Sequence, residues 1–229
     1  MTELTDQTII DLLSPFATPQ RFETMQTVLS QRTRYMTVVL EDIYQPQNAS
    51  AVLRSADGFG IQDVHIIENN HEYTLNPDVE KGASSWLNMH RYSSRENNTK
   101  QALKYLKSQG YRILATTPHT DDVNLDDVEI EKGKFALIFG TEVTGISDEV
   151  RAQADEFVKI PMYGFTESFN ISVSAAITMH HLRLKMEQSE VNWTLSEEEA
   201  NHLMVKWLRK TVRSSDSIIK RYINEQEFN

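Results

Sequence analysis

Residues 160–176 carry the most specific signal in the chain: Ile160-Pro-Met-Tyr-Gly-Phe-Thr-Glu-Ser-Phe-Asn-Ile-Ser-Val-Ser-Ala-Ala176. Pro161 stops a short apolar strand, and Ser168 and Asn170 are residue types that favour helix N-termini, so we predict a strand, a loop and a long helix over residues 170–187. Small side chains crowd the first turns of this helix: Ser172, Ser174, Ala175 and Ala176. Another segment of the chain must therefore pack very close to it.

The sequence before this stretch alternates short apolar runs with helical segments. The apolar runs lie at residues 36–40, 64–67, 86–92, 113–116, 135–139 and 157–160. Residues 49–57, 100–109 and 146–154 have the composition of helices. Strands that are apolar throughout and alternate with helices are typical of a sheet that is buried on both faces. We therefore predict an α/β fold with a mostly parallel sheet.

Both ends of the chain differ from this centre. Residues 1–34 have the pattern of helices, and the last 42 residues contain a capping box at Ser196–Glu199. We predict three segments. They are an N-terminal helical extension over residues 1–34, a core over residues 35–187 and a basic helical extension over residues 188–229.

The C-terminal extension carries a local excess of positive charge. The whole chain has 23 basic and 33 acidic residues, a net charge of −10, yet six bases and one acid lie between Leu203 and Arg221. An apolar stripe on this helix should dock it on the core: Leu203, Met204, Trp207 and Leu208. Four bases outside the stripe form a candidate nucleic-acid face: Lys206, Arg209, Lys210 and Arg213.

Composition excludes several classes of protein. The absence of cysteine excludes a disulfide framework and a thiolate zinc site, and it fits a reducing compartment, so we expect a cytoplasmic protein. No apolar run approaches the roughly 18 residues of a membrane span, and we expect no membrane association. His180 and His181 fall on different faces of the predicted helix, so we expect no metal site there.

The loop after residues 36–40 leads into the segment Gln47-Asn-Ala-Ser-Ala-Val-Leu-Arg54. Asn48 is expected to cap the helix that follows. Arg54 lies among small residues, which leaves room for a large anionic partner. An ion pair between Arg54 and Asp57 is the simpler explanation, although such a pair contributes only about 0.2–0.5 kcal/mol when it is exposed.

The loop after residues 135–139 reads Gly140-Thr-Glu-Val-Thr-Gly145. Its two glycines permit tight turning and a close approach of the backbone to a ligand. Glu142 can serve simply as an acid near the N-terminus of the next helix. The loop lacks the Gly-Lys-Ser/Thr of a P-loop, and Gly58-Phe59-Gly60 ends a helix, which counts heavily against a nucleotide-dependent dehydrogenase.

Ser168 lies in the third loop, and its simplest role is to cap a helix. It lacks the flanking glycines of a nucleophile elbow, so a hydrolase nucleophile is a poor interpretation. None of the three loops contains a histidine or a cysteine, so the usual general bases are missing as well.

In their order and spacing, the three loops resemble the SPOUT superfamily of knotted methyltransferases, and more closely the TrmH type of tRNA ribose 2′-O-methyltransferase. The resemblance covers residues 35–187. It rests on Gln45-Pro-Gln-Asn-Ala-Ser-Ala-Val-Leu-Arg54, Phe139-Gly-Thr-Glu-Val-Thr-Gly145, Ile160-Pro-Met and Ser168-Phe-Asn-Ile-Ser-Val-Ser174. Phe169 departs from the leucine that is common in the family. This residue contributes chiefly backbone, so we expect little consequence.

The resemblance implies a deep trefoil knot in the C-terminal part of the core, which accounts for the small residues of the last core helix. It also implies S-adenosylmethionine as the cofactor, held by backbone of the three loops. By position, the cofactor-binding residues are Thr116, Gly140, Ile160, Met162 and Phe169.

The resemblance implies five catalytic residues: Arg54, Asn48, Glu142, Ser168 and Asn170. Arginine has a pKa above about 12, so we expect Arg54 to grip a phosphate and stabilise developing alkoxide charge, and leave open whether it accepts the proton. Asn48 and Asn170 would orient the ribose or Arg54, Glu142 would hold Arg54 or Asn170, and Ser168 would order its loop. No metal is required.

The terminal extensions resemble those of the branch that methylates guanosine 18 in the D-loop of tRNA. Methylation of another tRNA nucleotide or of rRNA is the alternative. A non-catalytic RNA-binding knot protein fits less well, because a binding protein has no need of all five catalytic residues. The resemblance also implies a homodimer, and the four basic residues of the C-terminal extension would track tRNA phosphates.

Overall fold

The computed structural model describes residues 4–74, 76–94, 97–117, 123–141 and 144–227. The chain divides into two compact units. The first unit combines Met1–Arg32 with Thr194–Asn229, and the second is Thr33–Trp193. The N- and C-terminal extensions, which the sequence analysis treats as separate segments, thus form one helical unit. The second unit is called the core unit below.

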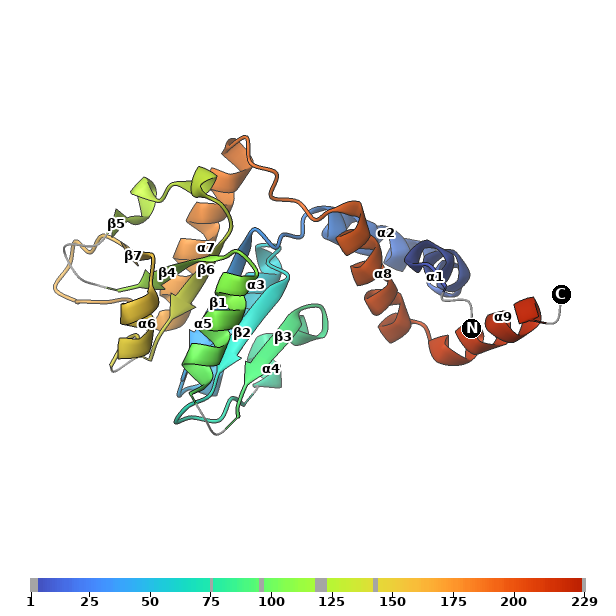
Figure 1. Ribbon diagram of the computed structural model, residues 1–229, viewed down its shortest axis with the longest axis horizontal. Coiled ribbons are helices and arrows are strands. Elements are labelled where there is room, and N and C mark those ends of the chain that lie inside the picture. The colour runs from blue at the N-terminus through green and yellow to red at the C-terminus, as the bar shows by residue number, and fades with distance from the viewer. Residues whose placement is uncertain (1–3, 75, 95–96, 118–122, 142–143, 228–229) are drawn as a thin grey trace. The chain divides into compact units, whose positions relative to one another are not determined.

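The described residues of the core unit form a seven-stranded sheet in the order β3-β2-β1-β6-β4-β7-β5 (Figure 1). Its strands are β1 Met36–Glu41, β2 Asp63–Ile67, β3 Asn88–Tyr92, β4 Arg112–Thr116, β5 Val123–Asn124, β6 Phe135–Phe139 and β7 Glu156–Lys159. Every pairing between these strands is parallel, which confirms the predicted sheet. The trefoil knot stays a prediction.

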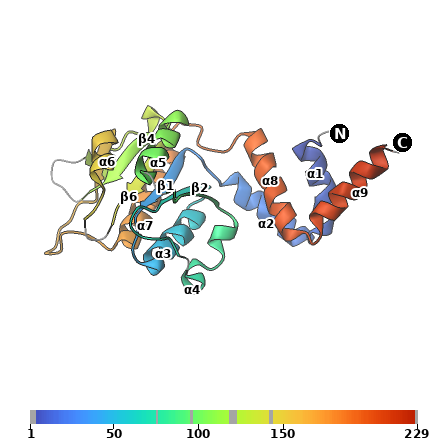
Figure 2. The same ribbon diagram turned by 60° about the horizontal axis from the view of Figure 1, so that its bottom comes forward.

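Helices cover both faces of this sheet, as the two ribbon views show (Figures 1 and 2). The helices of the core unit are α3 Pro46–Gly58, α4 Pro77–Glu80, α5 Asn98–Ser108, α6 Asp148–Gln153 and α7 Ile171–Gln188. Single 3-10 turns lie at Ala83–Ser85, Leu125–Asp127 and Ile130–Lys132. α5 and α6 pack on one face, while α3 and α7 contribute to the apolar cluster on the other face. β1 and β6 are buried along their whole length, which explains why apolar residues fill β6 and most of β1.

The structure corrects the predicted role of Asn48 as a helix cap. α3 begins at Pro46, three residues earlier than predicted, and Gln45 occupies the N-cap position. Proline is favoured at the first helical position because it has no N–H to leave unpaired and its φ is already helical. Asn48 therefore lies inside the first turn, where its side chain is available for other contacts.

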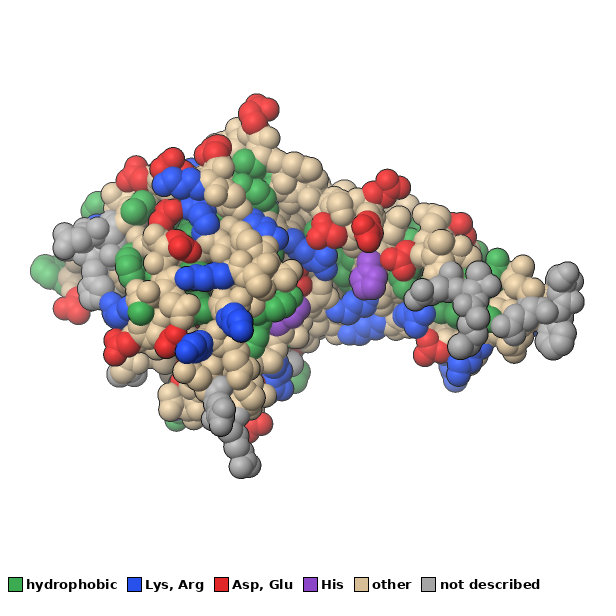
Figure 3. Space-filling view, viewed as in Figure 1, with side chains coloured by type: hydrophobic (Ala, Val, Ile, Leu, Met, Phe, Trp, Pro, Cys, Tyr) green, Lys and Arg blue, Asp and Glu red, His purple; other side chains and the backbone are tan. Residues whose placement is uncertain are grey.

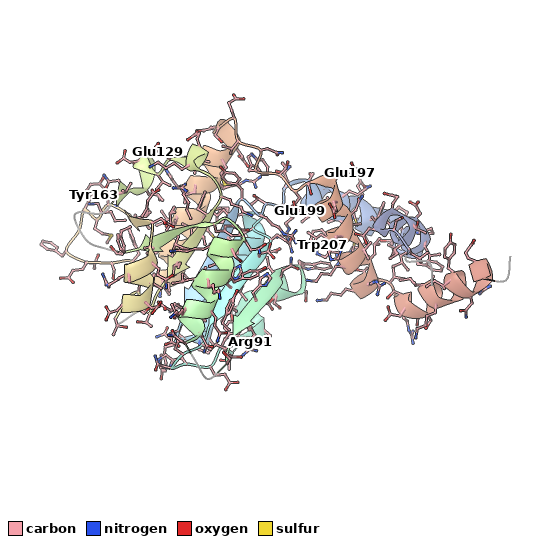
Figure 4. All side chains as sticks on the ribbon, viewed as in Figure 1. Arg91, Glu129, Tyr163, Glu197, Glu199 and Trp207 are labelled. Carbon is pink, nitrogen blue, oxygen red and sulfur yellow. The ribbon has the colours of Figure 1, made fainter. Side chains whose placement is uncertain are left out.

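The helical unit consists of α1 Asp6–Leu13, a 3-10 turn at Ser14–Phe16, α2 Pro19–Ser30, α8 Glu197–Thr211 and α9 Ser215–Glu227. The predicted capping box at Ser196 and Glu199 is present, at the end of α8 where Figure 4 labels Glu197 and Glu199. Trp207 is 2% exposed, and the guanidinium of Arg32 lies 5.5 Å from its ring centroid. The stripe of α8 is buried as predicted, and α8 packs against α1 and α2 of the same unit; its expected docking on the core stays a prediction. Its apolar partners are supplied by the N-terminal extension.

None of the described helices is both long enough and apolar enough to cross a membrane.

Candidate active site

A cavity of about 720 Å³ lies where β4, β6 and β7 end. This is the carboxyl edge of the parallel sheet, the usual location of ligand sites in open α/β folds. The cavity is walled by residues of the loops that follow these strands and by the first turns of α3 and α7. Its volume falls in the range that holds a small organic ligand.

All five predicted cofactor-binding residues line this cavity: Thr116, Gly140, Ile160, Met162 and Phe169. They come from three separate connections, since Thr116 ends β4, Gly140 follows β6 and the other three follow β7. The Thr116 hydroxyl donates a hydrogen bond to the Ile138 carbonyl at 2.9 Å, so its side chain ties β4 to β6 at the cavity wall.

The loop from Gly140 to Gly145 folds back on itself. The Thr141 N–H donates to the Gly145 carbonyl at 2.9 Å, and the Gly145 N–H donates to the Thr141 carbonyl at 3.1 Å. A Cβ at position 140 would lie 2.3 Å from the carbonyl carbon and oxygen of Gly145. Backbone atoms this close leave no room for any side chain, so the pinched loop that walls the cavity requires glycine at this position.

Two predicted catalytic residues meet although they are 122 positions apart in sequence. The Asn170 amide donates to Asn48 Oδ1 at 3.2 Å, and the Asn48 amide donates to Gln45 Oε1 at 3.2 Å. Asn170 also caps α7, because its Oδ1 accepts hydrogen bonds from the Ser172 N–H and hydroxyl. Asn48 is 7% exposed, and all three amides line the cavity. The contact joins the first and third loops directly.

The remaining predicted catalytic residues are placed differently. Ser168 lines the cavity and is exposed. Glu142 lies outside the described residues. Arg54 is exposed on α3 and is not among the residues that line the cavity; toward the described residues its side chain makes no hydrogen bond and no ion pair, including the ion pair considered with Asp57. Within one chain, the structure therefore does not bring Arg54 to the asparagine pair.

The loop from Gly140 to Gly145 is anchored through Ser147 by a buried carboxylate that was not predicted from the sequence. Glu41, the last residue of β1, is 2% exposed. Its Oε1 accepts hydrogen bonds from the hydroxyls of Thr99 and Ser147, and its Oε2 accepts one from the Ser147 N–H. Ser147 caps α6 directly after Gly145-Ile146. An acidic residue at the end of an otherwise apolar strand was the available signal.

Polar residues that the sequence analysis did not single out also reach the cavity. They are Gln45, Thr117, Arg151, Lys159, Glu167 and Thr178. Gln45 precedes the proline that opens α3, and its place in the quoted motif was the signal for it. Lys159 ends β7, so its place at the carboxyl edge of the sheet could have identified it.

The lining is suited to a cofactor that combines apolar and polar parts. Phe139, Val158 and Ile171 supply apolar wall, while the pinched glycine loop brings backbone close to whatever is bound. Among the residues that the structure describes, no group of three or more His, Asp or Glu side chains is arranged to hold a metal ion. Such a cavity defines an α/β protein that binds an organic cofactor at the carboxyl edge of its sheet.

Comparisons with known proteins narrow this class. The model of the SpoU rRNA Methylase family matches residues 35–180. The chain is 45% identical over 205 residues to the tRNA (guanosine(18)-2′-O)-methyltransferase of Borreliella burgdorferi, covering 90% of this chain and 92% of that protein. It is 29% identical over 195 residues to the protein of the same name from Thermus thermophilus, covering 84% and 98%.

A solved structure agrees with these sequences. The A. aeolicus TrmH/SpoU tRNA modifying enzyme matches with a TM-score of 0.74 at 26% identity, covering 85% of this chain and 98% of that chain. The chain belongs to the SpoU rRNA Methylase family. The resemblance to TrmH-type SPOUT methyltransferases is therefore confirmed.

Gly140→Ala tests the cavity wall. A Cβ at this position must push the loop open, and overpacking of this kind costs about 1–3 kcal/mol. We expect the affinity for S-adenosylmethionine, measured by calorimetry, to fall roughly 10- to 100-fold. Gly164→Ala is the matched control, because a Cβ there meets nothing within 4 Å. Equal affinities in the two variants would contradict the role of the pinched loop.

Proposed function

We propose that this chain transfers a methyl group from S-adenosylmethionine to the ribose 2′-hydroxyl of guanosine 18 in tRNA. The observation that carries the proposal is the convergence of the three motif loops on one cavity, with Asn48 joined to Asn170. Two relatives bear the name of this activity, and the chain aligns with 92% and 98% of their lengths. The cofactor supplies an activated methyl group on sulfur, so no metal is needed for the transfer.

The asparagine pair is the proposed binding place for the ribose. Asn48 is fixed by Gln45, and Asn170 is fixed by its hydrogen bonds as the cap of α7. Both side chains are therefore oriented before substrate binds, which lowers the entropic cost of positioning the 2′-hydroxyl. Ser168 orders the loop that carries Asn170, and Glu142 keeps its proposed role as a holder of Arg54 or Asn170.

Arg54 is the proposed phosphate clamp. Its guanidinium stays protonated at neutral pH and can form two parallel hydrogen bonds to a phosphate. Its exposure on α3 leaves it open to a large anionic partner. Held beside the reacting ribose, the positive charge stabilises the alkoxide that develops as the hydroxyl loses its proton.

The active form that we propose is a homodimer. Phe169, Val173 and Leu184 are large apolar residues that α7 and the loop before it leave exposed. A second copy packed on this surface would cover them and would bring its own Arg54 toward a cavity that lacks one. Because the substrate is tRNA, the proposed compartment is the cytoplasm.

The helical unit supplies the proposed tRNA-binding surface. Lys206, Arg209, Lys210 and Arg213 are all exposed, while the apolar stripe of the same helix is buried. Arg209 pairs with Asp216 at 3.3 Å. Basic and acidic side chains both appear on the visible face of this unit (Figure 3).

Transfer of labelled methyl groups to unmodified tRNA, followed by identification of the modified nucleotide, tests the activity. We expect 2′-O-methylguanosine at position 18 with the natural sequence. Arg54→Ala should lower turnover by roughly two orders of magnitude or more, because it removes an electrostatic stabiliser of the transition state, yet keep S-adenosylmethionine affinity. Arg221→Ala, an exposed arginine of α9, is the control.

If the labelled methyl group appears only in rRNA, or at another nucleotide of tRNA, then guanosine 18 of tRNA is not the substrate. Loss of cofactor binding in Arg54→Ala would contradict the assignment of this residue to the RNA.

Sedimentation equilibrium tests the dimer. We expect a species of about twice the 26.4 kDa chain mass, because burying the exposed apolar residues of α7 is favourable. Val173→Glu should shift the equilibrium toward monomer and lower turnover together. An active 26.4 kDa monomer would contradict the proposal.

Neutralising Lys206, Arg209, Lys210 and Arg213 tests the basic face. We expect weaker tRNA binding and a flatter dependence of log affinity on log salt, by roughly one unit of slope per lost phosphate contact. Folding should change little, because exposed charges contribute little to stability. A control variant neutralises the exposed Lys100, Lys104 and Lys107 of α5. If the two variants bind tRNA alike, the RNA docks elsewhere.

A further inference from the structure

An aromatic pair lies on two loops at the carboxyl edge of the sheet, with Tyr44 after β1 and the half-buried His71 after β2. Tyr44 is 68% exposed, and its ring contacts His71 edge to face with centroids 5.0 Å apart. Neither residue belongs to the motifs or to the cavity lining described above. A tyrosine this exposed gains little from burial, so its ring is available to a partner.

The position of Tyr44 is set by its two neighbours in the chain. Ile43 on one side is buried in the core, and Gln45 on the other side lines the cavity and contacts Asn48. Tyr44 therefore lies in a short segment anchored at both ends, and the next residue along the chain, Gln45, contacts one of the proposed ribose-binding asparagines.

The segment that presents His71 is pinned by a buried carboxylate. Asp42 is 5% exposed, and its Oδ1 accepts hydrogen bonds from the N–H groups of Asn69, Asn70 and His71 at 2.8–3.0 Å. Its Oδ2 accepts a further bond from the Asn70 side chain. Asp42 adopts a φ of +56°, a conformation that aspartate tolerates better than most residues. His71 is thus held in place by its own backbone.

A second carboxylate, that of Glu68, also binds the segment that contains His71. Glu68 accepts a hydrogen bond from the Tyr73 N–H and two from Arg91, which lies at the end of β3 (Figure 4). Burial alone would raise the pKa of Glu68, but the hydrogen bonds from Arg91 and Tyr73 outweigh burial and lower it. The backbone of residues 68–73 is therefore fixed at both ends around His71.

We propose that Tyr44 and His71 form a stacking platform for the nucleobase of the target nucleotide. This inference rests on the proposed function. A nucleotide whose ribose enters the active site must leave its stack in the folded RNA, and the base then needs another flat partner. Aromatic side chains serve in this way in many RNA-binding proteins. Tyr44 directly precedes Gln45, which holds Asn48, so the base attached to a ribose at the asparagines is the occupant that we propose.

Tyr44→Ala, Tyr44→Phe and His71→Ala in the full chain test the platform. We expect Tyr44→Ala to weaken binding of unmodified tRNA and raise its KM roughly 10- to 100-fold, since stacking on one aromatic ring contributes this much to RNA affinity. Tyr44→Phe should bind as the natural sequence does, and calorimetric affinity for S-adenosylmethionine should be unchanged. Tyr105→Ala is the control, an exposed tyrosine of α5 whose ring packs on His65 and His90.

A change in the substrate tests whether Tyr44 contacts the target base. A tRNA with an abasic target nucleotide should bind the natural sequence more weakly, and Tyr44→Ala should weaken that binding no further. Additive losses, or unchanged tRNA affinity in Tyr44→Ala, would overturn the platform while methylation by the natural sequence still stands. If Tyr44→Ala instead sediments as a smaller species, the ring belongs to a self-association surface and the platform is wrong. If the natural sequence neither binds nor methylates tRNA, the proposed function fails and the platform fails with it.

Discussion

Two adjacent buried carboxylates, Glu41 and Asp42 at the end of β1, organise the carboxyl edge of the sheet. Glu41 binds Thr99 of α5 and Ser147 before α6, and Asp42 binds the backbone that follows β2. Without these acceptors, several N–H and hydroxyl groups would be buried without a hydrogen-bond partner, which would lower the stability of the fold. Three segments that are remote in sequence are therefore held against the end of β1 by two consecutive residues.

The active site inherits its rigidity from this arrangement. The loop from Gly140 to Gly145 leads directly into Ser147, so Glu41 fixes the end of the segment that walls the cofactor cavity. On the other side of the cavity, Asn170 is fixed as a helix cap and in turn holds Asn48. Apolar side chains, hydroxyls, amides and the charged Arg151, Lys159 and Glu167 line the cavity between these two fixed points.

The features that could be predicted from the sequence are those that depend on residues close together in the chain. β1 and β6 could be found because they are buried on both faces, and the capping box of α8 could be found because its residues are three apart. The contact between Asn48 and Asn170 could not, since the two are 122 residues apart and meet only after the sheet is assembled. The anchoring roles of Glu41 and Asp42 were missed for the same reason, and the start of α3 was misplaced because Asn48 looked like a better cap than Gln45.

The helical unit is built from both ends of the chain, with α8 packed against α1 and α2. During synthesis on the ribosome, the first two helices emerge long before their partner exists, while the whole sheet is made in between. Their apolar faces are covered only once α8 has been made, so this unit is completed after the core unit has been synthesised. A nascent chain that stops at the end of the core unit has every residue of the cavity but an unfinished helical unit. Only chains that have been translated through α8 can therefore complete the helical unit.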